Sequence, residues 1–178
     1  PLRVLSTETP YTSYLKISEG CDHTCAFCAI PLMRGLHRSQ PVDEMVREAA
    51  GLGARGVKEI NIVSQDTTWY GRDARRRDQE APLLPELLRE LIDGTDVPWY
   101  RLFYMYPSGI TREMVDLIAS EARIVPYLDM PIQHGSDRVL ELMRRPERTQ
   151  TIRERVGWLR EAIPDLPLRP TVGPLSHR

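Results

Sequence analysis

Five short apolar runs alternate with amphipathic segments along this chain of 178 residues, and this alternation restricts the fold more than any other feature. The runs have the length and composition of β-strands, whereas the segments between them carry apolar residues at helical spacing. The expected strands are residues 14–18, 57–64, 99–105, 127–130 and 166–172. The expected helices are 41–54, 84–92, one capped by Thr111, one capped by Ser136, and 149–163, with a polar loop at 65–81. This order predicts an α/β fold with a parallel sheet, but the pattern alone does not separate a barrel from a doubly wound sheet.

All three cysteines of the chain follow the first expected strand, as Cys21, Cys25 and Cys28 in a C-x3-C-x2-C array. Gly20 ends the strand, so the thiols lie on a loop just beyond it. Three thiolates on one short loop can hold three corners of a cubane iron–sulfur cluster, which four cysteines hold in most proteins. One iron would then lack a protein ligand and could bind a small molecule.

The cysteines have two alternative uses. A disulfide framework is disfavoured, because the number of cysteines is odd and the sequence shows no export signal. A structural zinc ion needs a fourth ligand, which His23 or His37 could supply. A non-catalytic zinc-binding module is therefore the alternative from a different class of protein.

Composition mainly excludes other classes of function. The net charge of −1 gives no basic field that would favour binding of nucleic acid. The sequence has no run of apolar residues long enough for a transmembrane helix, so we expect no membrane partner. Free cysteines without an export signal predict a protein of the reducing cytoplasm.

The cysteine array, with Phe27 just before its last cysteine, resembles the signature of the radical S-adenosylmethionine (SAM) enzymes. Residues 64–71 (SQDTTWYG) and 127–136 (YLDMPIQHGS) resemble the methylthiotransferase branch of that family. Within the branch, they are most similar to the group that methylthiolates the β-carbon of an aspartate in small-subunit ribosomal protein number twelve. The tRNA-adenosine methylthiotransferases are the alternative, with RNA as the partner, but they more often carry asparagine in the segment that reads SQDT here.

The resemblance, which extends over residues 14–171, implies a partial parallel (β/α) barrel of the TIM-barrel-like type with about five of six β/α units. It also implies two cofactors, a 4Fe–4S cluster on the three cysteines and SAM bound to the open iron through its amino and carboxylate groups. One electron from the reduced cluster would cleave SAM to a 5′-deoxyadenosyl radical. The electron donor would be a protein such as flavodoxin or ferredoxin.

In parallel β/α barrels the active site lies at the carboxyl ends of the strands, and several polar residues of this chain fall there. The resemblance makes Gln65, Asp66, Gln133 and Ser136 candidates for contact with SAM or substrate, although each could equally be an ordinary loop-capping residue. Arg34 could face an acidic substrate or form a structural salt bridge. No catalytic side chain is assigned. The other polar or aromatic residues expected at this rim are Ser64, Thr67, Tyr104, Tyr106, Pro107 and His134.

The expected domain organisation is a fragment of a longer enzyme. Residues 1–12 are interpreted as a linker from an N-terminal domain, 13–172 as a truncated radical SAM core, and 173–178 as an atypical tail. Members of the family carry an N-terminal domain with three further cysteines and a C-terminal TRAM domain. We therefore expect this chain to hold one cluster but not to complete methylthiolation alone.

Overall fold

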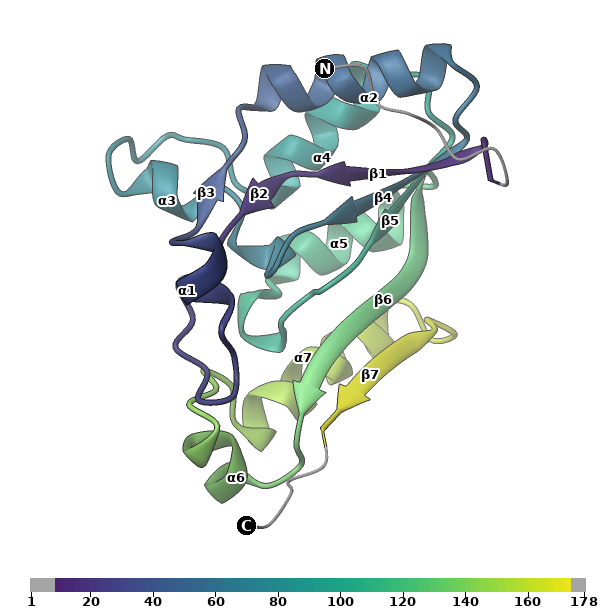
Figure 1. Cartoon of the computed structure of the whole chain (residues 1–178). Coiled ribbons are helices and arrows are strands. Elements are labelled where there is room, and N and C mark those ends of the chain that lie inside the picture. Colours follow the sequence, from purple (N-terminus) through teal and green to yellow (C-terminus); the bar gives the residue numbers. More distant parts are fainter. Residues whose placement is uncertain (1–8, 174–178) are drawn as a thin grey trace.

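The computed structural model describes residues 9–173, and within them five parallel strands form one sheet (Figure 1). The strands are β1 (Thr12–Lys16), β4 (Glu59–Val63), β5 (Trp99–Leu102), β6 (Ile124–Gln133) and β7 (Leu168–Val172). They pair in the order β1–β4–β5–β6–β7, which is also their order along the chain. A doubly wound sheet reverses its strand order at a switch point, whereas a barrel does not. The predicted partial parallel barrel is therefore confirmed.

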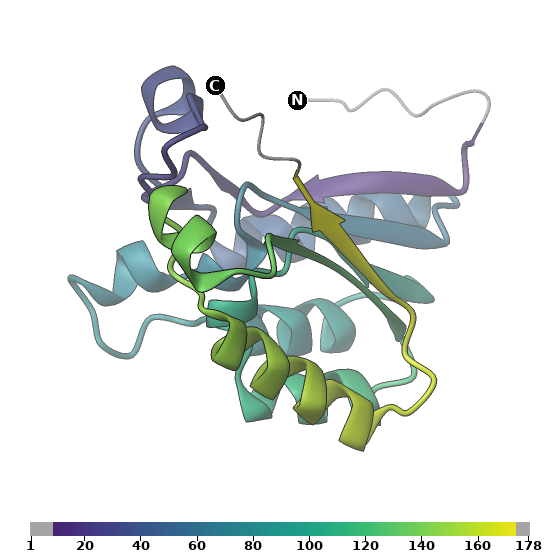
Figure 2. The ribbon, with the colours of Figure 1, turned by 90° about the horizontal axis from the view of Figure 1, so that it is seen from below.

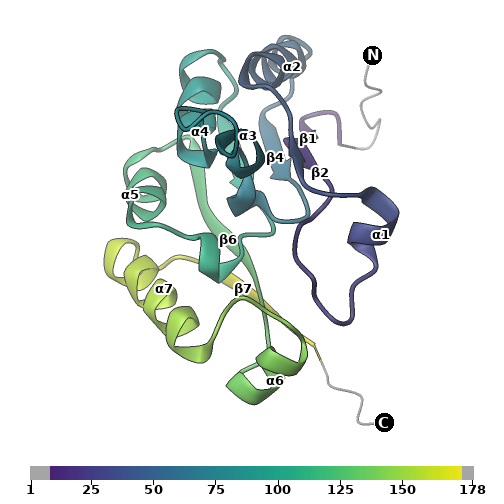
Figure 3. The ribbon, with the colours of Figure 1, turned by 90° about the vertical axis from the view of Figure 1, so that its left-hand side faces the viewer.

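Helices connect successive strands and cover one side of the curved sheet, where they form an arc in Figure 3. They are α2 (Val42–Ala54), α4 (Leu84–Asp93), α5 (Arg112–Ser120) and α7 (Thr149–Ala162). Thr111 begins α5 as predicted, because its hydroxyl accepts a hydrogen bond from the Met114 amide at 3.2 Å. The other side of the sheet is left to form the interior of the partial barrel.

The core lies between the sheet and this arc of helices. One layer of it consists of Leu15, Ile62, Leu102 and Leu128, which are paired side by side across four strands and are fully buried. Successive residues of a strand face opposite sides, so their neighbours in the sequence face the barrel interior. The apolar layer therefore fixes which side chains point toward the interior.

Two short helices mark the carboxyl ends of the strands. Helix α1 (Ile30–Arg34) follows the cysteines, and α6 (Asp137–Leu142) follows β6. The cysteine loop runs between them in Figure 1, Figure 2 shows these two regions of the chain side by side, and the Ala26 amide donates a hydrogen bond to the Met143 carbonyl at 3.0 Å. This bond ties the cysteine loop to the end of α6.

Three local predictions were wrong in extent. The strand expected at 14–18 is divided, since Ser18–Glu19 (β2) leaves the main sheet and pairs antiparallel with Arg38–Ser39 (β3). The segment 65–81 contains a short 3₁₀ helix and α3 (Arg72–Arg75) rather than only loop. Strand β6 is longer than the predicted 127–130, because its pairing continues past two prolines through shifts of register. The first and third errors arose where tertiary pairing outweighs local pattern.

None of the helices in residues 9–173 is long and apolar enough to cross a membrane. Most of the predicted linker and tail, residues 1–8 and 174–178, lies outside the described part of the chain. The predicted domain boundaries at 12 and 172 therefore stay predictions.

Candidate active site

The cysteine loop folds back against the segment before β3. Its first cysteine amide, that of Cys21, donates a hydrogen bond to the Gly35 carbonyl at 3.1 Å. Gly20 has a φ of +75°, and a Cβ atom there would lie 2.2 Å from the Leu36 carbonyl oxygen. Only glycine fits this position. The loop therefore starts directly after β2 with its direction fixed by backbone contacts.

The thiols lie partly inside the protein, where their chemistry suits metal binding. Cys21 and Cys25 are buried and Cys28 is half-buried. Burial raises the pKa of the Cys21 thiol to about 11, so its thiolate needs a positive partner. A metal ion supplies that charge and deprotonates its cysteine ligands outright.

The described side chains around the loop do not gather as the ligands of a single metal ion. In residues 9–173 no three His, Cys, Asp or Glu side chains gather closely enough to hold one metal ion. A structural zinc site needs four ligands around one point, whereas each thiolate of a cubane cluster binds a different iron. The two histidines considered as zinc ligands have other partners, since Nε2 of His23 lies 2.7 Å from Asp66 and Nε2 of His37 lies 3.2 Å from Ser39.

A stack of aromatic rings supports the cysteine loop from the ends of the neighbouring strands. The His23 ring stacks on Tyr106, with centroids 5.0 Å apart and an interplanar angle of 5°, and it also contacts Trp69 at 4.5 Å. Asp66 fixes the imidazole of His23, and its other oxygen accepts hydrogen bonds from the amide and hydroxyl of Thr68 at 3.0 and 2.6 Å. Three separate segments of the chain are thereby held together under the cysteines.

Arg145 was missed by the sequence analysis, although it contacts the cysteine loop. Its buried guanidinium donates to Sγ of Cys25 at 3.8 Å and to the Pro131 carbonyl at 2.9 Å, and it lies 4.1 Å from the Tyr106 ring. The sequence signal would have been the run Arg144–Arg145 after a predicted helix. That run does not show which arginine points inward.

A cavity of roughly 740 Å³ opens inside the barrel at the carboxyl ends of the strands. It is lined by Tyr14, Lys16, Ile30, Val63, Ser64, Gln65, Phe103, Tyr104, Tyr106, Asp129, Pro131, Gln133, Arg169 and Thr171. Gln65 and Gln133 are thus brought together as the rim rule predicts, with Ser64, Tyr104 and Tyr106. Oε1 of Gln65 is buried without a hydrogen-bond partner among the described residues, so it can accept a bond from a ligand.

Strained backbone marks the same cavity. Tyr104 and Gln133 have φ values of +56° and +61°, in the left-handed region that side chains rarely adopt. Tyr104 follows β5, Gln133 is the last residue of the adjacent strand β6, and both line the cavity. Such strain costs roughly 1–3 kcal/mol per residue and persists chiefly at functional sites.

The remaining candidate residues do not line the cavity. Asp66 is engaged by His23 and Thr68, so its predicted contact with SAM stays a prediction. Ser136 occupies the N-terminal cap position of α6, but within the described chain its hydroxyl makes no capping bond, and its amide donates instead to Nδ1 of His134 at 3.0 Å. Nη1 of Arg34 lies 3.9 Å from Glu19, which supports a structural ion pair.

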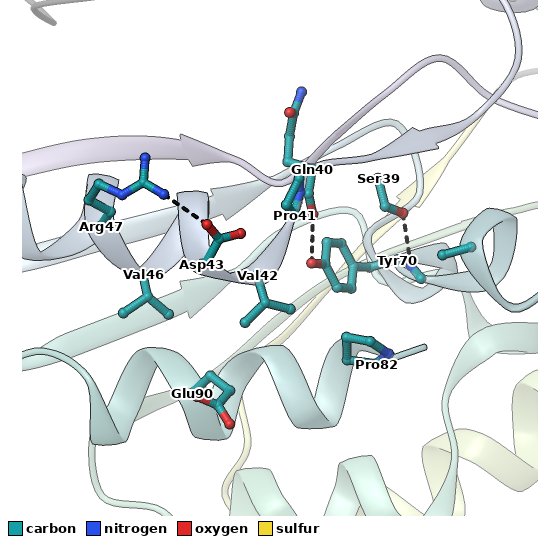
Figure 4. A pocket seen from close by; sticks show the side chains of 12 residues that line it. Ser39, Gln40, Pro41, Val42, Asp43, Val46, Arg47, Tyr70, Pro82 and Glu90 are labelled. Carbon is teal, nitrogen blue, oxygen red and sulfur yellow. Dashed lines mark hydrogen bonds and ion pairs between the residues drawn. The ribbon is translucent and has the colours of Figure 1, made fainter. Parts of the chain in front are cut away.

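A second cavity, of roughly 780 Å³, lies on the outer face between α2 and the segment that leads into α4 (Figure 4). The Tyr70 hydroxyl at its wall donates to the Gln40 carbonyl at 2.7 Å, and Asp43 pairs with Arg47 at 2.8 Å. Because these polar groups already have partners and the carboxyl ends of the strands lie elsewhere, we assign the cofactor site to the barrel cavity.

The chain belongs to the radical SAM superfamily, whose family model matches residues 15–176. Membership of this superfamily implies a 4Fe–4S cluster and SAM. The cysteine array, the buried thiols and the adjoining cavity fit these two cofactors.

Two curated relatives are named ribosomal protein uS12 methylthiotransferase RimO. The protein of Symbiobacterium thermophilum is 50% identical over 169 residues, covering 95% of this chain and 34% of the relative. The protein of Sorangium cellulosum is 47% identical over 169 residues, covering 94% of this chain and 34% of the relative. This chain therefore spans about a third of the length of the curated relatives.

Solved structures agree on the fold. The radical SAM methyltransferase TsrM from Kitasatospora setae, with tryptophan and a SAM analogue bound, gives a TM-score of 0.65 at 17% identity, covering 92% of this chain and 30% of that chain. The cobalamin-dependent radical SAM enzyme OxsB, with aqua-cobalamin and SAM bound, gives 0.67 at 11% identity, covering 93% and 24%.

Proposed function

We propose that this chain is the radical SAM core of an enzyme that methylthiolates the β-carbon of an aspartate in small-subunit ribosomal protein number twelve. The observation that carries the proposal is the identity of 47–50% to RimO proteins over more than nine-tenths of this chain. In this proposal residues 13–172 form the truncated core domain, residues 1–12 a linker from an N-terminal domain and residues 173–178 an atypical tail. The enzyme works in the cytoplasm, with flavodoxin or ferredoxin as its electron donor.

The residues of the chain have two roles in this proposal, which are to hold the cluster and to orient SAM. Cys21, Cys25 and Cys28 hold the cluster, and SAM occupies the barrel cavity with Gln65 and Gln133 as polar contacts. Asp66 and Ser136 remain candidate contacts. A reduced cluster held there would supply the single electron that cleaves SAM into methionine and a carbon radical, which the target carbon requires because it carries no acidic proton. The protein orients the reactants and keeps water out.

The proposal is tested by following the hydrogen of the target carbon. The chain is reconstituted with iron and sulfide and given SAM, a chemical reductant and a ribosomal-protein peptide deuterated at the β-carbon of its aspartate. We expect deuterium in the 5′-deoxyadenosine product, because the radical takes its hydrogen from that carbon. A variant with all three cysteines changed to alanine is the control and should form no product.

Cleavage of SAM without transfer of deuterium, stimulated instead by tRNA, would contradict the proposed substrate. That result would favour the tRNA-modifying alternative. We expect no complete methylthiolation of the peptide by this chain alone, because the family's additional cysteines are absent from its sequence.

A further inference from the structure

A buried ion pair lies against the cysteine loop, on the segment that follows α6. The side chains of Arg145 and Glu147 are both completely buried, with Nε of Arg145 3.1 Å from Oε2 of Glu147. Ser108 donates a hydrogen bond to the other carboxylate oxygen of Glu147 at 3.1 Å. Burying two charges costs free energy that a packed apolar pair would not, so stability alone is a weak reason for this pair.

The contacts of Arg145 aim its guanidinium at a predicted cluster ligand. One terminal nitrogen donates to the Pro131 carbonyl, the other donates to Sγ of Cys25, and the Tyr106 ring covers one face of the group. Glu147 forms an ion pair with the remaining nitrogen, although the two atoms do not have the geometry of a hydrogen bond. The guanidinium is therefore held against the sulfur from several sides.

Arg145 keeps its charge in this position. A guanidinium stays protonated in proteins, and the Glu147 carboxylate beside it favours the cation further. Burial also raises the pKa of Tyr106 to about 12, so its phenol stays neutral. Water and salt screen a charge at this depth far less than a charge at the surface.

We propose that Arg145 is a positioning residue that holds a fixed positive charge against the Cys25 sulfur and thereby raises the reduction potential of the cluster. The reduced cluster carries one more electron than the oxidised cluster, so a nearby positive charge stabilises it more. Local charge and hydrogen bonds to sulfur are among the factors that set such potentials. The inference rests on the cluster proposed above and concerns how readily it accepts an electron, not whether it forms.

The test is a redox titration of the reconstituted protein followed by EPR, with iron counted in each sample. At the midpoint potential of the unchanged protein, Arg145→Gln should lower the ratio of reduced to oxidised cluster about tenfold, which is a shift of about 59 mV for a one-electron couple. Glu147→Gln should shift the midpoint to higher potential, because it removes the negative charge that offsets Arg145. Arg144→Gln is the matched control and should cause no shift, since that side chain is exposed.

Full iron content with an unchanged midpoint in Arg145→Gln would overturn the inference and leave the cluster itself standing. If that variant does not fold, Glu147→Gln decides the question, and a shift to lower potential or no shift would overturn the inference. Failure of the unchanged protein to take up iron would overturn both the cluster and the role of Arg145.

Discussion

Two arginines at opposite ends of the barrel show how differently the two ends are built. At the amino end, Arg123 donates to the backbone carbonyls of Ile92, Thr95 and Val97 at 2.6 to 2.9 Å, so main-chain oxygens of this chain satisfy it. At the carboxyl end, Arg145 is held against a thiol. In the cavity at the same end, the amide oxygen of Gln65 has no partner within residues 9–173.

The difference separates a closed structural end from an end prepared for ligands. Polar groups at the amino end join loops to one another. Residues at that end of such barrels usually contribute to stability. The strained residues Tyr104 and Gln133 lie at the carboxyl end, together with the cysteines. Strain and unpaired polar groups are tolerated there because the site is shaped for molecules that bind it.

The largest effect on the carboxyl end is expected from a substitution at Gly20. Gly20→Ala should distort the cysteine loop, because the new Cβ atom would overlap the Leu36 carbonyl, and we expect most iron binding to be lost after reconstitution. Gly56→Ala is the matched control, since Gly56 also has a positive φ, of +91°, but has open space around it and lies just after α2, away from the cysteines. It should cost only about 1–2 kcal/mol and keep its iron. Equal loss of iron in both variants would contradict this account.

A substitution at Arg123 tests whether the amino end contributes to stability but not to function. Arg123→Met should lower the free energy of unfolding by about 2–3 kcal/mol, because several buried carbonyls lose their donor. Urea denaturation measures this, with Arg89→Met as a surface control expected to cost under about 1 kcal/mol. The reconstituted Arg123 variant should keep the cluster potential of the unchanged protein. A changed potential would show that the two ends are not separate in function.

A substitution at Gln133 tests the binding of SAM in the cavity. Asparagine tolerates positive φ better than most residues, so Gln133→Asn should not lower the free energy of unfolding. The shorter side chain of asparagine should weaken SAM binding about tenfold. That factor corresponds to about 1.4 kcal/mol, as expected for the loss of one good hydrogen bond. Equilibrium dialysis with labelled SAM measures the affinity. The matched control is Arg144→Asn, another position with positive φ, which should bind SAM normally. Unchanged affinity in Gln133→Asn would remove Gln133 from the site.

The smallest expected effect is the pH dependence from His37. Burial lowers the pKa of His37 below its ordinary 6.5, so the unfolded state binds more protons than the folded state. The contribution of His37 to stability is therefore complete above about pH 6.5 and is lost as the pH falls toward the folded pKa. Denaturation at several pH values should show this trend, and His37→Gln should reduce it. An undiminished trend in the variant would assign it to other groups.

The sequence predicted the features that depend on local spacing. The strand–helix alternation and the glycine that follows the first expected strand were sufficient to expect a parallel sheet with the cysteines at the carboxyl end of that strand. The resemblance then selected the barrel, which the strand order confirms.

Features that depend on distant contacts could not be predicted from the sequence. Arg145 meets Cys25 across 120 residues of chain, and its neighbour Arg144 looks the same in the sequence. The positive φ values of Tyr104 and Gln133 had no glycine to signal them. Asp66 was chosen for SAM by its motif, yet the structure shows its carboxylate held by His23 and Thr68.

The central claim is that the carboxyl end of this barrel holds a cluster with one iron open to SAM. EPR of the anaerobically reconstituted and reduced chain, recorded with and without SAM, tests this claim most directly. We predict about four irons per chain and a spectrum that changes when SAM is added, because SAM binds the open iron. Uptake of zinc without iron, or an iron spectrum that SAM leaves unchanged, would contradict the claim.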